Sequence, residues 1–187
     1  MNRGKGSAVY QDIQEIMFSE QQLAEKAAEI GAKISRDYAG KNPLLVGILK
    51  GSCMFFADMV RKIDIPCTID FMAVSSYGKG AVSSREVVIL KDLSYPVTDR
   101  HVILVEDILD SGRTLSNLMR LLSARDAASV EICTLLDKPS GRKVEVEAKY
   151  SGFTVPDAFL VGYGLDYAEN YRNLPYIGVL KPEIYQK

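Results

Sequence analysis

The chain alternates between short, wholly apolar runs and longer segments in which apolar residues recur at helical spacing. Residues 44–49 and 102–105 are the clearest apolar runs, and polar residues follow each of them. Runs of this length, rich in Val, Ile and Leu, are typical of strands buried on both faces of a parallel sheet. After each run, apolar residues return three, four or seven positions apart, which predicts a helix after each strand.

The rest of the chain continues this alternation. Ser19 followed by Gln22 predicts a capping box, and the helix that it opens keeps one apolar face up to Gly40. Residues 1–18 show no strong period. Further strands are predicted at residues 67–74, 86–91, 130–136, 144–150 and 176–180, with the strand at 86–91 pairing with the one before it. Strands that alternate with helices predict an α/β fold in which helices cover both faces of a parallel sheet.

Composition narrows the class of protein. The 187 residues fit one domain, and 47% hydrophobic with 25% charged residues is ordinary for a globular protein. The net charge of −1 gives no reason to expect a nucleic-acid partner. The three cysteines form no Cys-x-x-Cys pair and are expected to be small, reduced core residues. No apolar run has the length of a membrane span, so a cytoplasmic protein with no membrane partner is expected.

Residues 101–115 hold the strongest chemical signal. The buried strand runs into Glu106 and Asp107, and then into the turn 110–114, Asp-Ser-Gly-Arg-Thr, before the next helix. In an open α/β sheet this turn lies where ligands bind, and the N–H groups of a helix start favour a phosphate. Three acids beside a phosphate would repel it. A sugar phosphate held with Mg²⁺ removes the conflict, because its hydroxyls and the cation both suit carboxylates.

The turn differs from the common triphosphate-binding loop, Gly-x-x-x-x-Gly-Lys-Ser/Thr, because Asp107 stands at the first Gly and Arg113 at the Lys. It resembles the phosphoribosyl-diphosphate signature of the type I phosphoribosyltransferases, in the form typical of the hypoxanthine-guanine members. The resemblance implies a single domain, 1–187. Its parallel-sheet core spans about residues 40–140, and a small hood comes from the terminal segments.

The resemblance also assigns residues to phosphoribosyl diphosphate. Lys50 and Gly51 match a turn of the family that binds the diphosphate and has a cis peptide after the Lys, and Arg172 matches a diphosphate-binding arginine. Ser76 and Tyr77 match a pair in a loop that closes over the site. From the residues alone, Lys50 and Gly51 could form an ordinary turn, and Arg172 could be a surface side chain. The full implied set is Lys50, Gly51, Glu106, Asp107, Asp110, Ser111, Gly112, Arg113, Thr114 and Arg172.

The same resemblance implies a purine site and a metal site. Lys138 would contact the exocyclic oxygen of a 6-oxopurine, which argues against adenine. Phe159 would stack on the base, although by itself it suits a core position, and Leu160 would offer its backbone to the base edge. Asp166 completes the purine segment and reaches Mg²⁺, the implied cofactor, together with Glu106 and Asp107.

The implied reaction transfers a phosphoribosyl group to N9 of hypoxanthine or guanine, with Asp110 as the catalytic base. Two alternatives remain open from the sequence. One is a regulator of the same fold that binds RNA, which the near-neutral charge and Lys138 disfavour. The other is a transferase that prefers xanthine, since the ranking of related bases depends on small differences in pocket geometry. The family habit implies a homodimer or homotetramer.

Overall fold

The computed structural model describes residues 11–75 and 88–186. The predicted closing-loop residues Ser76 and Tyr77 lie outside these described residues. In chain order the elements are β1 (Ile13–Phe18), α2 (Glu20–Asp37), β2 (Leu44–Leu49), α3 (Cys53–Val60), β3 (Thr68–Ser75), β4 (Val88–Lys91), β5 (His101–Leu109), α4 (Arg113–Ser123), β6 (Ser129–Asp137), the 3-10 turn η1 (Pro139–Gly141), β7 (Tyr150–Thr154), β8 (Leu160–Val161), β9 (Ile177–Leu180) and α5 (Pro182–Tyr185).

The larger sheet has six strands in the order β4-β3-β2-β5-β6-β7. Its pairs are parallel except at one edge, where β4 pairs with β3 as the sequence predicts and runs antiparallel to it. In the middle of the sheet, Leu45 is in register with Ile69 of β3 and with Ile103 of β5. The central strands β2 and β5 carry the apolar runs of the sequence, and these runs are buried on both faces.

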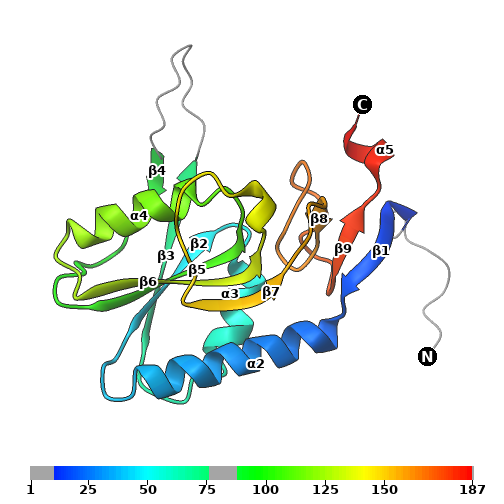
Figure 1. Cartoon of the computed structure of the whole chain (residues 1–187). Coiled ribbons are helices and arrows are strands. Elements are labelled where there is room, and N and C mark those ends of the chain that lie inside the picture. Colours follow the sequence, from blue (N-terminus) through cyan, green and yellow to red (C-terminus); the bar gives the residue numbers. More distant parts are fainter. Residues whose placement is uncertain (1–10, 76–87, 187) are drawn as a thin grey trace, which may run out of the picture.

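Helices cover both faces of this sheet, as predicted (Figure 1). The sheet therefore separates two hydrophobic clusters. On one face, α2 and α3 pack Leu23, Ile30 and Phe55 against the sheet. On the other face, α4 packs Leu115 and Leu118. The α/β architecture is therefore the one predicted from the alternation of strands and helices. Within the described residues, the helices are all too short or too polar to cross a membrane.

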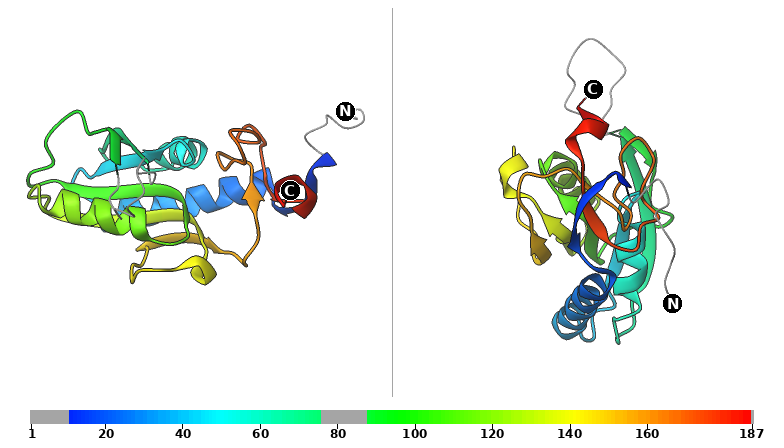
Figure 2. Two further views of the ribbon diagram at one scale, coloured as in Figure 1. Left: turned by 90° about the horizontal axis from the view of Figure 1, so that it is seen from above. Right: turned by 90° about the vertical axis from the view of Figure 1, so that its right-hand side faces the viewer.

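A second, three-stranded antiparallel sheet stands at one end of the molecule, in the order β1-β9-β8 (Figure 2). It combines the first described strand with the last two. The strand β1 is not predicted, because only part of its surface is buried and its burial does not alternate. The capping box at Ser19 is present and leads directly from β1 into α2.

Two predicted details are wrong. Residues 144–149 form no strand, and β7 begins at Tyr150. Val144 and Val146 give the segment its apolar alternation, but they pack beside Gly112 at the start of α4, and the Val146 carbonyl accepts a hydrogen bond from Arg142. The cis peptide bond lies before Lys50, between Leu49 and Lys50, and not after it.

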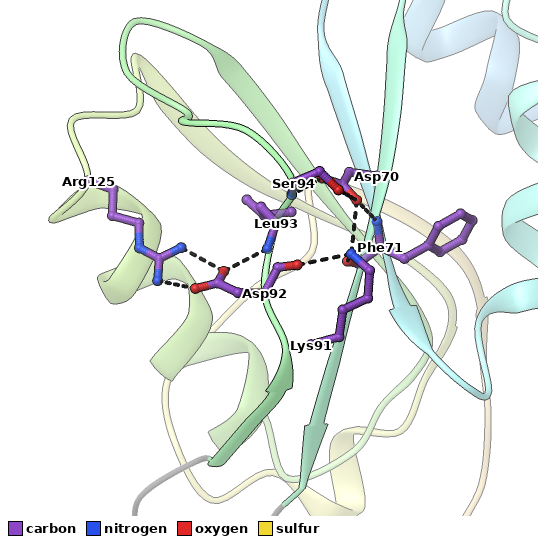
Figure 3. A network of polar contacts seen from close by, with 7 residues as sticks. All are labelled: Asp70, Phe71, Lys91, Asp92, Leu93, Ser94 and Arg125. Carbon is purple, nitrogen blue, oxygen red and sulfur yellow. Dashed lines mark hydrogen bonds and ion pairs between the residues drawn. The ribbon is translucent and has the colours of Figure 1, made fainter.

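A polar network fixes the end of β4 against its neighbours (Figure 3). Asp70 of β3 accepts hydrogen bonds from the backbone N–H of Ser94, at 2.6 Å, and from Lys91, at 3.2 Å. Asp92 forms a two-pronged ion pair with Arg125, which follows α4. Burial alone would raise the pKa of Asp70, but the backbone N–H groups and Lys91 together lower it.

Candidate active site

The turn between β5 and α4 forms a cavity of about 170 Å³ at the carboxyl end of the central strand. Gly112 is the N-cap of α4 and has a left-handed backbone with φ of 77°, which glycine adopts without strain. Arg113, the next residue, does not line this cavity. The lining comprises Glu106, Asp107, Ile108, Leu109, Asp110, Ser111, Gly112, Thr114 and Leu115.

Glu106 and Asp107 are neighbouring carboxylates, and neither forms an ion pair with a residue in the described part of the chain. Burial raises the pKa of both groups, and the negative charge of Asp107 raises the pKa of Glu106 further. Arg172 acts on Asp107 in the opposite direction. Two oxygen ligands held near each other at this cost suit a hard divalent cation, whose charge would favour the ionised forms.

The residues therefore fit Mg²⁺, provided that a substrate supplies further oxygens. In the described part of the chain, no three acidic, histidine or cysteine side chains converge as a metal site. Mg²⁺ commonly binds through one or two carboxylates plus substrate phosphates, so a pair is enough. The metal role of Asp166 beside Glu106 and Asp107 stays a prediction.

The turn after β2 meets the acids of β5 at the same edge of the sheet. A Cβ atom at Gly51 would overlap the carboxylate of Asp107, so only glycine lets the two turns approach this closely. Lys50 extends from the turn, and its ammonium pairs with Glu169 at 2.9 Å, with both side chains about two-thirds exposed. An exposed pair of this kind is weak, so an incoming anion can displace Glu169 from Lys50.

The segment between β8 and β9 lies against the turn after β2. Arg172 pairs with Asp166 at 2.8 Å and donates a 2.7 Å hydrogen bond to the carbonyl of Gly164. A Cβ atom at Gly164 would overlap the carbonyl of Gly51, so this segment packs directly on the Lys50–Gly51 turn. The buried Nε of Arg172 has no hydrogen-bond partner among the described residues. Lys50, Asp166 and Arg172 thus belong to one cluster.

Asp110 is held by residues of the segment after β6, a contact that the sequence does not reveal. A Cβ atom at Gly141 would overlap the Asp110 carboxylate, so this glycine gives the carboxylate its room. Arg142 donates hydrogen bonds to the carbonyls of Asp110, at 3.0 Å, and Leu109, at 3.2 Å, and pairs with Asp137. Gly141 and Arg142 were not predicted as site residues. Their only sequence signal is that they follow the strand that ends beside the central one.

The predicted purine residues lie on two elements that meet. Lys138, at the end of β6, pairs with Asp157 at 2.7 Å, and its side chain is only 15% exposed. Phe159 stacks on Tyr185 of α5, with ring centroids 4.7 Å apart, so a C-terminal residue that was not predicted belongs to this region. The side chain of Leu160 is buried in the core, which leaves its backbone for any contact with a base.

Comparison with known proteins agrees with this geometry. A family model described as the phosphoribosyl transferase domain matches residues 14–168. The chain belongs to this family. It is also 56% identical over 174 residues to the hypoxanthine-guanine phosphoribosyltransferase of Streptococcus pneumoniae, with 93% of this chain and 97% of that one covered. The resemblance to the hypoxanthine-guanine phosphoribosyltransferases that residues 106–114 indicate is confirmed.

Other relatives include both a protein of similar length and a much larger bifunctional protein. A hypoxanthine phosphoribosyltransferase from Staphylococcus aureus superposes with a TM-score of 0.93 at 49% identity, covering 98% of this chain and all of that one. A bifunctional protein named TilS/HprT from Listeria monocytogenes is 55% identical over 186 residues, the whole of this chain. The chain spans only 29% of the length of that larger protein.

Proposed function

We propose that this phosphoribosyltransferase salvages purines. It transfers the phosphoribosyl group of 5-phosphoribosyl 1-diphosphate to N9 of hypoxanthine or guanine, and gives IMP or GMP plus diphosphate. The observation that carries the proposal is the cavity of the β5–α4 turn. In this cavity the carboxylates of Glu106 and Asp107 lie near Gly112, the N-cap of α4. One site therefore has groups that can bind a ribose, a cation and a phosphate.

In this proposal the turn 110–114 holds the 5′-phosphate. Ser111 and Thr114 offer hydroxyls, and Gly112 and Arg113 offer the N–H groups at the start of α4. Glu106 and Asp107 hold the ribose hydroxyls or Mg²⁺. Magnesium, when bound there, supplies positive charge to oxygens of the substrate.

The diphosphate lies at the edge where the Lys50–Gly51 turn meets Arg172. Bond breaking at the anomeric carbon leaves negative charge on the diphosphate and positive charge on the ribose ring. Lys50 gives up its pair with Glu169 and binds the departing charge, together with the N–H of Gly51 and the guanidinium of Arg172. Fixed groups aimed at developing charge lower the barrier because they need little rearrangement.

Asp110 is proposed as the group that accepts or shares the purine proton. It lines the cavity beside Ser111, next to the turn that carries Lys138. A positioned base of this kind is worth about 10²–10⁴-fold in rate. The ammonium of Lys138 gives up part of its ion pair with Asp157 and donates a hydrogen bond to the exocyclic oxygen of the base. Phe159, Leu160 and Asp166 border the purine ring.

The domain organisation belongs to the same proposal. Residues 1–187 act as one domain, with the larger sheet as the core and the three-stranded sheet, built from both ends of the described chain, as the hood. We further propose Mg²⁺ as the cofactor and a homodimer or homotetramer as the assembly. A cytoplasmic location is supported by three free cysteines.

The test is nucleotide formation from phosphoribosyl diphosphate and Mg²⁺, with hypoxanthine, guanine, xanthine, adenine and uracil offered separately. We expect turnover with hypoxanthine or guanine that a chelator abolishes. Preference for xanthine would change the substrate and keep the reaction. Silence with every base from folded protein would reject the proposal in favour of an RNA-binding regulator, which a filter-binding titration at varied salt would reveal.

A further inference from the structure

A second cavity lies on the other side of the first turn of α4, apart from the proposed active site. Its volume is about 270 Å³, and its lining comprises Arg113, Ser116, Asn117, Arg120, Lys143 and Val144. No residue lines both this cavity and the one that contains Glu106 and Asp107. The helical members recur at three- and four-residue intervals, so they form one polar stripe of α4 that faces the 143–144 segment.

The charge of this cavity is of one sign. Arg113, Arg120 and Lys143 are all exposed, and the lining contains no Asp or Glu. Two cations of the neighbouring turn, Lys138 and Arg142, are each paired with a carboxylate. Among residues 11–75 and 88–186, no carboxylate is within ion-pair distance of the three cations. Three unneutralised cations around one hollow, in a chain of net charge −1, form a local binding site for a polyanion.

We propose that this cavity binds a small oligophosphate, either free or as the phosphate chain of a nucleotide. Two arginines and a lysine suit the three or more negative charges of such a chain, and Ser116 and Asn117 add neutral hydrogen-bonding groups. Val144 is the one apolar side chain of the lining, so recognition rests on the phosphates and not on a base.

The site is joined to the turn that holds the 5′-phosphate in the proposed function. The backbone N–H of Lys143 donates to the carbonyl of Ser111 at 3.0 Å, and Arg142 donates to the carbonyl of Asp110. Arg113 itself sits between Gly112 and Thr114, which both line the first cavity. An anion bound beside α4 therefore contacts Arg113, which belongs to the turn, and Lys143, which supports the turn from the other side.

The test is calorimetric titration of the whole chain with inorganic triphosphate, at low ionic strength and without Mg²⁺. We expect one equivalent to bind, in the second cavity, because without Mg²⁺ the acids of the first cavity repel a phosphate. The variant R120A/K143A should lose this binding. A matched variant, R36A/K62A, removes two exposed cations elsewhere and should keep it. Undiminished binding to R120A/K143A, or no binding to the wild type, would overturn the proposal.

Two additions make the result specific. The single variants R120A and K143A, each expected to weaken triphosphate binding severalfold, replace the double variant if circular dichroism shows that it is unfolded. A repeat with ATP separates the two sources of the ligand. Loss of ATP binding in R120A/K143A extends the site to nucleotides, and binding of triphosphate alone restricts it to free oligophosphates.

Discussion

The phenol of Tyr163 donates a 2.6 Å hydrogen bond to the carboxylate of Asp58. Tyr163 belongs to the segment that packs on the Lys50–Gly51 turn, and Asp58 lies on α3, the helix that follows this turn. Burial, and then the bond to Asp58, raise the pKa of Tyr163 well above its ordinary value, so the phenol stays a donor at every physiological pH. The bond thus fixes the two sides of the proposed diphosphate site relative to each other.

Replacing Tyr163 by Phe should loosen this connection without removing a group from the site. We expect KM for phosphoribosyl diphosphate to rise severalfold, KM for the purine to stay unchanged, and unfolding to become easier by about 1–2 kcal/mol. The control is Tyr150→Phe, because Tyr150 donates a similar 2.7 Å bond to Asp37 on the far part of α2. It should lose similar stability and keep both KM values. Equal kinetic effects in the two variants would contradict a positioning role for Tyr163.

Gly51→Ala should separate the two turns of the site. Its Cβ would overlap the Asp107 carboxylate, so one of them must move, and a displacement of about 1 Å can lower turnover about 100-fold. Steady-state kinetics and thermal unfolding would measure both effects. Gly40→Ala is the control, because a Cβ atom at Gly40 would meet open space and only its φ of 77° opposes the change. That variant should lose some stability and keep its activity. Normal turnover in Gly51→Ala would show that the contact is not required.

Asp110→Asn should keep the shape of the turn and remove the proposed proton acceptor. We expect kcat to fall about 10²–10⁴-fold, with a much smaller effect on the binding of phosphoribosyl diphosphate. Single-turnover kinetics and a direct binding titration would separate the two. If the variant were fully active, the proton would have to go elsewhere.

Asp70→Asn should destabilise the protein in a pH-dependent way. The folded pKa of Asp70 is lowered, so its contribution is present above the ordinary carboxyl pKa of about 4 and is lost as the pH falls through the folded value. Urea unfolding should therefore show a gap between variant and wild type at pH 7 that narrows towards pH 3. The exposed Asp64, changed to Asn, should show no such gap. A gap that is constant with pH would mean that packing, and not charge, is lost.

The sequence predicts the central part of the fold and site because its signals there are local. The strand at 102–105, the acids that follow and the helix after Gly112 all lie within a short stretch of chain. The neighbours that support them come from far along the chain. Gly141 beside Asp110, Tyr185 on Phe159 and the strand β1 depend on contacts that no periodicity reveals. The alternating Val144 and Val146 mislead for the same reason, since they pack on a helix start and not in a sheet.

The order β1-β9-β8 has a consequence for the synthesis of the protein. The middle strand of the small sheet, β9, is the last strand of the described residues, and it joins β1 to β8. During translation the larger sheet can form while Arg172 and β9 are still inside the ribosome. A chain that stops before β9 therefore loses the strand that connects the two edges of this sheet, and the proposed diphosphate side of the site stays incomplete until Arg172 and β9 have emerged.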